Sequence, residues 1–381
     1  MERMLKAREQ VETALISLTM FISIIGQIEP IRELFRPIMF ALWGVSLLFI
    51  VIANFNLIRI HRFSLFYLSS YGLYILFCFI ISLFNKDYLE TNFMTVLLPP
   101  LIVTLVSECY KPIASHYSIK IISLFFVMAS LIYAVWVHLT FFPSLVNWYS
   151  LNTYAFVSKN SAAQIWGSSI LLLFFFIEGK SKIFKWVYIF LSLYLLFLCF
   201  LSQCRTAILG ISCVFIWYFF KRKSSNISNK IFFYISIILI ALLIAIKWDA
   251  FSEFMDKALF LGAQDSLDAN QMSSGRIELY DIALSNILDS PLIGVGKYYV
   301  DNHYLCVLSE SGLVGFLLIE PVLITRLLIN FKYTGDYKYK IFLTAISIFY
   351  IVESFFEAFP PFGPGVTAMA FWFYSQILNK E

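Results

Sequence analysis

Long apolar runs separated by short polar segments extend along the whole chain. A helix that crosses a bilayer needs about 20 predominantly apolar residues, and several of the runs approach that length. The pattern predicts an all-α polytopic membrane protein with about twelve transmembrane helices, in a single membrane domain over residues 1–381. The predicted spans are 12–28, 37–57, 64–84, 93–109, 119–141, 162–178, 186–203, 206–220, 231–247, 310–330, 341–358 and 365–379.

The composition supports this class. Of the 381 residues, 60% are hydrophobic and only 14% are charged, which is more apolar surface than a soluble domain of this length can bury. The first apolar run follows the basic start MERMLKAR and has no small-residue cleavage site, so we expect a retained helix. The six cysteines show no pairing pattern and are expected to pack as small hydrophobic side chains.

The distribution of positive charge orients the chain. If the N-terminus lies inside, roughly two-thirds of the 28 lysines and arginines fall on inner segments, as the positive-inside rule requires. Both termini are therefore predicted to be cytoplasmic. The net charge of +4 is too small to favour nucleic acid as a partner. Pro99 and Pro100 are predicted to kink the fourth span.

One polar segment is much longer than the others. Residues 248–302 lie between the ninth and tenth predicted spans and fall on the outer side of the membrane. Loops longer than about 12–15 residues are usually functional or disordered. We therefore expect a large extracytoplasmic (periplasmic) loop that contains a helix from about Gly275 to Leu288, ended by an Asp-Ser-Pro sequence.

Arg205 is the only charged residue between Trp186 and Phe220. Both flanks of this stretch are basic and are predicted inside, so the turn at Arg205 is predicted outside. The next span, 206–220, is about 22 Å long against a hydrocarbon core of about 30 Å, so Arg205 is expected below the outer surface. A buried arginine costs several kcal/mol unless it is paired or lines a wet cavity. Arg205 is thus either part of an anion site or a snorkelling side chain with a structural carboxylate partner.

Arg276 stands at the start of the helix predicted in the outer loop, directly after a Ser-Ser-Gly sequence. Backbone N–H groups at a helix start and a guanidinium group can bind one phosphate together. Two arginines can hold a pyrophosphate by bidentate contacts, which lysine makes less well. The alternative is that Arg276 is a solvated surface charge.

His303 is one of four histidines and follows Asp301 and Asn302, which are candidates to orient its ring. An unperturbed imidazole titrates near pH 6.5, so it can take a proton from a hydroxyl group and release it again. The alternative is an interfacial histidine that hydrogen-bonds a loop. The sequence has no P-loop, D-x-D or zinc-binding motif, so no metal or nucleotide cofactor is expected.

Four short motifs in order resemble the O-antigen ligase and polymerase superfamily over roughly residues 160–380. They are S-Q-C-R-T-A at 202–207, S-G-R-x-x-x-Y from Ser274 to Tyr280, P-L-I-G-V-G at 291–296 and H-x-x-x-x-x-x-E-x-G from His303 to Gly312. The resemblance implies transfer of a glycan from an undecaprenyl pyrophosphate donor to an acceptor hydroxyl, without a metal, at the outer face of the bacterial inner membrane.

The resemblance also assigns residues. Arg205 and Arg276 match the arginines that bind the donor pyrophosphate, and His303 matches the histidine proposed to activate the acceptor. Glu310 matches the glutamate of the E-x-G turn, with no role that we can assign, and Asp301 is a supporting candidate. Cys204 stands where the family often has Ser or Thr.

The predicted function is that of a polysaccharide polymerase, which joins O-antigen or capsule repeat units by transfer to a lipid-linked acceptor with inversion. Membrane lipid and a chain-length regulator protein are the further partners expected. One alternative is an O-antigen ligase of lipopolysaccharide biosynthesis, which transfers the glycan to the lipid A core. A second is a flippase or transporter of lipid-linked oligosaccharides, which the lack of internal repeats disfavours.

Overall fold

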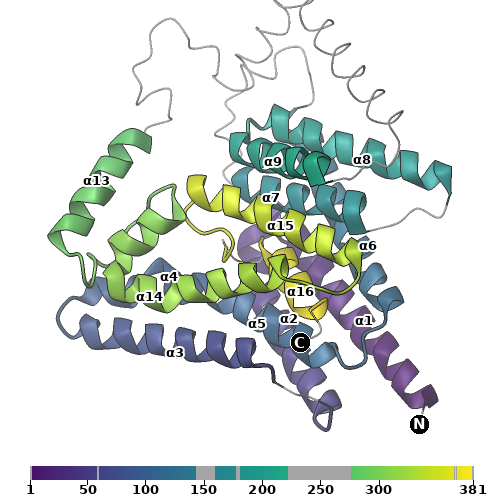
Figure 1. Ribbon diagram of the computed structural model, residues 1–381, viewed down its shortest axis with the longest axis horizontal. Helices are drawn as coiled ribbons and strands as arrows, with labels where there is room; N and C mark the ends of the chain where they lie inside the picture. The colour runs from purple at the N-terminus through teal and green to yellow at the C-terminus, as the bar shows by residue number, and fades with distance from the viewer. Residues whose placement is uncertain are drawn as a thin grey trace, which may run out of the picture.

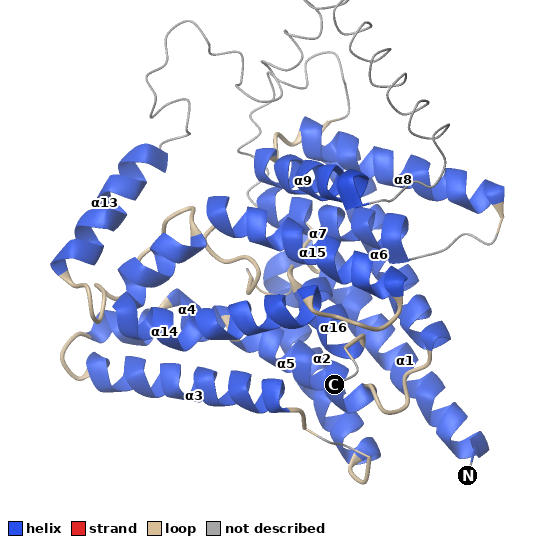
Figure 2. Ribbon diagram, viewed as in Figure 1, coloured by secondary structure: helices blue, strands red, loops and turns tan. Residues whose placement is uncertain are grey.

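The computed structural model describes residues 2–57, 60–142, 159–176, 181–221, 276–363, 365 and 367–379, and these contain helices and no strand (Figures 1 and 2). This confirms the all-helical class. The helices are α1 (Glu2–Ile25), α2 (Glu29–Asn54), α3 (Arg62–Ser82), η1 (Lys86–Glu90), α4 (Asn92–Val96), α5 (Leu98–Tyr110), α6 (His116–Phe141), α7 (Lys159–Leu171), the π-helical η3 (Leu172–Phe176), α8 (Lys182–Leu201), α9 (Arg205–Lys221), α13 (Arg276–Asp289), α14 (His303–Phe331), α15 (Tyr337–Phe356) and α16 (Met369–Ile377).

Within these residues, seven segments are long and apolar enough to cross a membrane. They are Pro37–Asn54, Arg62–Ser82, Lys86–Tyr110, His116–Phe141, Lys182–Leu201, His303–Phe331 and Tyr337–Phe356. Four other predicted spans, 12–28, 162–178, 206–220 and 365–379, are not among these seven. The predicted span 231–247 lies outside the described residues, as do residues 248–275 of the predicted outer loop. The count of about twelve spans and the outer loop therefore stay predictions.

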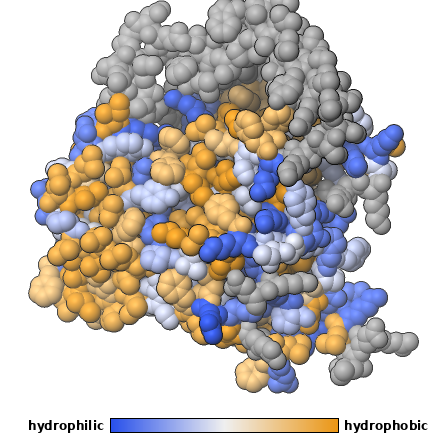
Figure 3. Space-filling model, viewed as in Figure 1, coloured by the Kyte–Doolittle hydropathy of each residue, from blue (hydrophilic) through white to orange (hydrophobic). Residues whose placement is uncertain are grey.

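The surface of the described part is apolar in the way that a bilayer requires. Figure 3 shows hydrophobic side chains gathered over the face that contains α3. A soluble protein rarely exposes so broad an apolar patch, whereas lipid tails accept one. The exposed apolar side chains of α3 include Leu65, Leu68, Leu73, Leu76 and Phe79.

The prolines of the fourth predicted span do more than kink it. Helix α4 ends at Val96, and α5 begins at Leu98 with its two prolines in the first turn. Proline fits the first turn of a helix because its missing N–H group would have no helical partner there. The Pro99–Pro100 pair therefore begins a new helix after a break.

Helix α14 begins at His303, seven residues before the predicted start of the span at 310, and it is broken at Gly312. The backbone of Gly312 has φ 61° and ψ −165°, a left-handed region that side-chain-bearing residues rarely adopt. The break leaves backbone groups of α14 without helical partners. In a membrane such groups must be satisfied by other parts of the protein.

The P-L-I-G-V-G segment supplies those partners. It lies along the broken part of α14 and makes four backbone hydrogen bonds: Val295 N to Ser309 O, Gly296 N to Glu310 O, Leu313 N to Pro291 O and Val314 N to Leu292 O, at 2.9–3.0 Å. A Cβ atom on Gly294 would lie 2.6 Å from the carbonyl carbon of Glu310, and one on Gly312 would lie 2.4 Å from that of Leu292. The P-L-I-G-V-G motif and the E-x-G turn thus form one backbone contact, and each needs its glycine to approach the other closely.

Helices α7, α9 and α15 pack closely around Phe349. A Cβ atom on Gly210 of α9 would lie 2.9 Å from the Phe349 ring, and one on Gly167 of α7 would lie 2.3 Å from it. Small residues allow such close helix packing in membranes. Lys221, the last residue of α9, lines a pocket with Tyr337, the first of α15, so the two helices are antiparallel. The start of α9 therefore lies at the C-terminal end of α15.

Candidate functional site

Arg276 is the centre of a charged cluster at the C-terminal end of α15. It is the first residue of α13, which confirms the predicted helix, although Gly275 lies outside the described residues. Its Nε lies 3.3 Å from Oδ2 of Asp301, and its Nη2 lies 3.5 Å from Oε1 of Glu357. The Arg276 side chain is only 24% exposed. It is therefore held between two carboxylates and differs from the solvated surface charge that was the alternative.

Asp301 ties α13 to the start of α14. Its Oδ1 accepts a hydrogen bond of 2.7 Å from the Tyr299 hydroxyl, and its backbone carbonyl accepts one of 2.9 Å from the Tyr280 hydroxyl. Burial and the Asp301 charge raise the pKa of Tyr299, so this hydroxyl stays protonated as a donor. Tyr280 follows Arg276 by one helical turn, which places both side chains on one face of α13. This spacing explains the S-G-R-x-x-x-Y motif.

Glu357 is the second carboxylate on Arg276, and it directly follows α15. Its side chain is 8% exposed, and its Oε1 also accepts a hydrogen bond of 2.9 Å from Asn160 at the start of α7. Burial raises the pKa of Glu357 to about 7, helped by the nearby Asp301 charge and opposed by Arg276. Glu357 thus changes its charge near neutral pH, directly beside the guanidinium.

A second carboxyl group lies one turn before Glu357. Glu353 is buried in α15, and within the described structure its Oε1 atom has no hydrogen-bond partner. A buried carboxyl oxygen without a partner usually marks a bound water, an ion or a functional group.

Arg205 begins α9 at this same end of α15 and is partly buried. It follows a turn in which Gln203 adopts a left-handed backbone with φ 54°. The thiol of Cys204 donates to the carbonyl of Lys159 at 3.4 Å, which joins the start of α9 to the start of α7. The structure therefore brings Arg205 and Arg276 to one end of the helix bundle. Burial raises the pKa of Cys204 to about 12, so its thiol is protonated.

His303 is the first residue of α14 and is fully buried. Its Nδ1 lies 3.1 Å from the carbonyl oxygen of Ala358, and its Nε2 lies 2.7 Å from Oε1 of Glu320. A carbonyl oxygen only accepts, so Nδ1 carries a proton here, and Nε2 shares a proton with the Glu320 carboxyl group. Both ring nitrogens are therefore engaged. The role of His303 as a base stays a prediction.

The contact between His303 and Glu320 depends on the break in α14. In a straight helix, residues 17 positions apart are separated by about 25 Å. Because the helix is interrupted at Gly312, its two parts bring these side chains together. Rings of Phe93, Tyr304 and Phe362 surround the imidazole at centroid distances of 5.5–5.6 Å.

The predicted orienting residues of His303 have other partners. Asn302 caps α14, because its Oδ1 accepts from the backbone N of Leu305 at 3.0 Å, and its Nδ2 donates to the carbonyl of Phe355. Asp301 pairs with Arg276. The expectation that Asp301 and Asn302 orient the ring is therefore wrong, and Glu320 takes that place.

Glu310 is buried, and its carboxyl group contacts the start of α4. Its Oε2 accepts from Asn92 Nδ2 at 3.0 Å, and its Oε1 accepts from the backbone N of Phe93 at 3.2 Å. The backbone N–H groups at a helix N-terminus lack helical partners, so the carboxyl oxygen of Glu310 satisfies one of them at the start of α4. This contact gives Glu310 an anchoring role in the structure.

Sequence reasoning missed Asn160, Glu320 and Glu357 as parts of the site. Glu320 and Glu357 are among the few carboxylates near apolar spans, and that rarity is a usable signal of function. The i, i+4 spacing of Glu353 and Glu357 is a second signal, because it places both on one helix face. Within the described part, no group of three or more His, Cys, Asp or Glu residues is placed to hold a metal ion.

The comparison with protein families matches the part of the chain that holds these motifs. Residues 190–319 match the O-antigen ligase family model. The match confirms the resemblance to the O-antigen ligase and polymerase superfamily and supports, at the level of the family, a membrane glycosyltransferase. It includes Arg205, Arg276 and His303, whereas Glu320 and Glu357 lie beyond it. No curated protein matches the chain.

Proposed function

We propose that the chain is a polysaccharide polymerase, which transfers a glycan from an undecaprenyl pyrophosphate donor to the hydroxyl of a lipid-linked acceptor glycan. The observation that carries the proposal is the Arg276 cluster, in which a guanidinium is held by Asp301 and Glu357 at the end of α15 where α9 begins with Arg205. Two guanidinium groups beside helix starts suit a pyrophosphate.

Donor binding is then an exchange of partners at Arg276. The pyrophosphate replaces the carboxylates as the anion on the guanidinium. Because the pKa of Glu357 is about 7, a second anion close by favours the protonated form of this residue. Glu357 can therefore give up Arg276 by taking a proton, which offsets part of the negative charge that the donor brings.

In the reaction, the acceptor oxygen attacks the anomeric carbon of the donor, and the bond from that carbon to the pyrophosphate oxygen breaks with inversion. The leaving group is already good, so catalysis needs stabilisation of its charge more than an acid. Arginines fixed in place before the reaction supply that stabilisation, and removing one such donor typically costs about 10²–10³ in rate.

His303 is the proposed base for the acceptor hydroxyl. In the competent form, Nδ1 has released its proton to solvent and the imidazole is neutral, while ionised Glu320 holds the proton on Nε2. The acceptor hydroxyl takes the place of the Ala358 carbonyl at Nδ1. Nδ1 then receives the hydroxyl proton as the new glycosidic bond forms. Glu320 thus orients the ring and stabilises the imidazolium, as a buried carboxylate does in a catalytic triad.

Glu357 is the second candidate for the base, because its pKa of about 7 and its contact with Arg276 suit proton transfer beside the donor. A single-turnover assay separates the two, with purified protein and a lipid-linked repeat unit. If His303 is the base, His303→Ala and Glu320→Ala lose turnover with similar donor affinity, whereas Glu357→Gln mainly changes donor affinity. Loss of turnover in Glu357→Gln alone would assign the base to Glu357.

The proposal places the Arg276 end of α15 on the periplasmic side of the inner membrane and both termini in the cytoplasm. Lysines at the opposite ends of α9, α14 and α15 support this orientation by the positive-inside rule: Lys221, Lys332, Lys338 and Lys340. A polymerase and a ligase differ in their acceptor, which is a lipid-linked glycan for the first and the lipid A core for the second. A chain-length regulator protein is a further partner that we propose for the polymerase.

A deletion strain tests the function itself. Loss of a polymerase leaves surface glycan with a single repeat unit on a gel. Loss of a ligase leaves lipid-linked polymer that never reaches the surface, and loss of a flippase traps repeat units inside the cell. Either of the last two patterns would overturn the proposal.

A further inference from the structure

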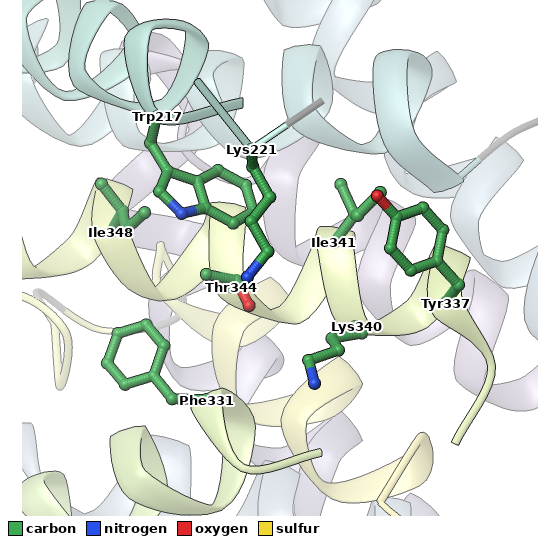
Figure 4. A pocket seen from close by; sticks show the side chains of 8 residues that line it. All are labelled: Trp217, Lys221, Phe331, Tyr337, Lys340, Ile341, Thr344 and Ile348. Atoms are coloured by element: carbon green, nitrogen blue, oxygen red, sulfur yellow. The ribbon is translucent and has the colours of Figure 1, made fainter. Parts of the chain in front are cut away.

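A pocket of about 350 Å³ lies between α9, α14 and α15, at the opposite end of α15 from Arg276. Its wall includes the aromatic side chains of Trp217, Phe331 and Tyr337. Lys221 extends from α9 to lie beside α15, and Lys340 of α15 lines the same space (Figure 4). None of the residues that line this pocket takes part in the Arg276 cluster.

The pocket follows one face of α15. Its lining residues on this helix recur at intervals of three, four and seven positions, from Tyr337 through Lys340 to Ile348, which is the spacing of one helical stripe. Between Tyr337 and Ile348 the stripe extends about 16 Å along the helix axis. Apolar and polar groups are separated along it: Ile348, Trp217 and Phe331 lie toward one end, and Tyr337 and Lys340 toward the other.

The polar end carries positive charge. No aspartate or glutamate is among the residues that line this pocket in the described structure. The nearest acid along α15 is Asp336, which caps the helix by accepting from the backbone N of Lys338 at 2.8 Å. Lys221 and Lys340 therefore give the pocket a net positive potential that a bound anion would neutralise.

We propose that this pocket binds one anionic glycerophospholipid of the cytoplasmic leaflet. The headgroup phosphate lies between the amino groups of Lys221 and Lys340, and an acyl chain lies along Trp217, Phe331 and Ile348. Lysines near the cytoplasmic surface attract acidic lipids, and tryptophan and tyrosine favour the level of the headgroups. A soluble anion would leave the apolar length of the groove unfilled, so the shape and charge favour a lipid.

The test compares phosphatidylglycerol with phosphatidylethanolamine by native mass spectrometry of the purified full chain. The variant Lys221→Gln/Lys340→Gln removes both amino groups from the pocket. The matched control Lys332→Gln/Lys338→Gln removes two charges from the same end of the bundle. Lys332 follows α14, and the amino group of Lys338 lies 5.8 Å from the Phe176 ring centroid, so neither lines the pocket.

We expect the wild type to bind phosphatidylglycerol more tightly than phosphatidylethanolamine. Each lysine near a membrane surface contributes about five-fold, so the pocket variant should lose roughly 25-fold in affinity for phosphatidylglycerol. The control should change less than about two-fold, and Lys221→Arg/Lys340→Arg should restore binding. Thermal unfolding in detergent shows that the variants are folded.

Three results would overturn the proposal. They are equal affinity of the wild type for the two lipids, equal losses in the pocket variant and in the control, and displacement of the lipid by glycerol phosphate at the same concentration. The last result would mark a site for a free anion, because the acyl chain would then contribute nothing.

Discussion

The two ends of α15 hold positive charge in opposite ways. At the C-terminal end, Arg276 contacts the carboxylates of Asp301 and Glu357, and Asn160 donates to the second of these. At the N-terminal end, Lys221 and Lys340 line a pocket whose described walls carry no carboxylate. One end balances its cation with acids of the same chain, and the other end does not.

This difference separates a site for turnover from a site for lasting attachment. An anion that binds at Arg276 must replace a carboxylate, so the net gain is small and release is easy. An anion that binds at Lys221 and Lys340 adds attraction without replacing a carboxylate of the wall. A leaving pyrophosphate suits the first arrangement, and a lipid that stays with the protein suits the second.

The largest expected effect comes from removing Arg276 from the Arg276 cluster. Arg276→Ala should lower turnover of the lipid-linked donor by about 10²–10³, because it removes a fixed cation from the developing charge of the leaving group. Arg276→Lys should recover only part of this rate, since an ammonium group cannot make the two parallel contacts of a guanidinium. The measurement is polymer formation by purified protein with a lipid-linked repeat unit.

The control is Lys297→Ala, which removes an exposed cation that lies 2.9 Å from Glu90. Exposed ion pairs contribute little, so this variant should keep the wild-type rate. Wild-type turnover in Arg276→Ala would remove Arg276 from the reaction and with it the contrast between the two ends.

The second prediction concerns the break in α14 at Gly312, which allows His303 to contact Glu320. Gly312→Ala should destabilise the protein by a few kcal/mol, because φ of 61° strains the alanine backbone and its Cβ would lie 2.4 Å from the carbonyl carbon of Leu292. The contact of His303 with Glu320 should fail with it, so activity is lost as well. Thermal unfolding in detergent measures the first effect.

Gly44→Ala in α2 is the matched control, since its Cβ would meet nothing within 4 Å. Alanine is favoured over glycine in a helix by about 0.5–1 kcal/mol, so this variant should unfold at the same or a higher temperature. Equal behaviour of the two variants would show that the loop 291–296 does not depend on Gly312.

Local features of the site could be predicted from the sequence. The start of α13 at Arg276 follows from helix periodicity and the preceding glycine, and Arg205 stands out as a lone charge in apolar sequence. Each of these inferences needs only a short stretch of chain. The apolar spans can also be predicted from short stretches of chain, because bilayer thickness sets the number of apolar residues that each one needs.

Contacts between distant segments could not be predicted in this way. Glu320 reaches His303 only because the backbone of α14 breaks at Gly312, and that break needs the backbone of residues 291–296 to satisfy it. Glu357 reaches Arg276 through the packing of α15. The position of Asn302 beside His303 in the sequence suggested that it orients the imidazole ring. Its side chain instead caps the start of α14 by accepting from the backbone N of Leu305.

The smallest effect is the pH dependence of the exchange at Arg276. Burial raises the pKa of Glu357 to about 7 from 4.5, so the folded protein binds this proton more tightly than the unfolded chain. Its contribution to the free energy of unfolding therefore falls as pH rises from 4.5 to about 7. Above pH 7 ionised Glu357 holds Arg276 more firmly. The KM for the donor should accordingly rise about five-fold between pH 6 and pH 8.

Glu357→Gln should flatten this rise in KM and keep the donor affinity that the wild type shows at pH 6, because glutamine is neutral throughout. Glu90→Gln is the control: Glu90 is exposed and pairs with Lys297, so its loss should leave the pH profile of KM unchanged. Steady-state rates at several donor concentrations separate KM from kcat. An unchanged rise of KM in Glu357→Gln would mean that Arg276 does not exchange Glu357 for the donor. The Arg276 cluster would then bind an anion without releasing a carboxylate, as the pocket of Lys221 and Lys340 does.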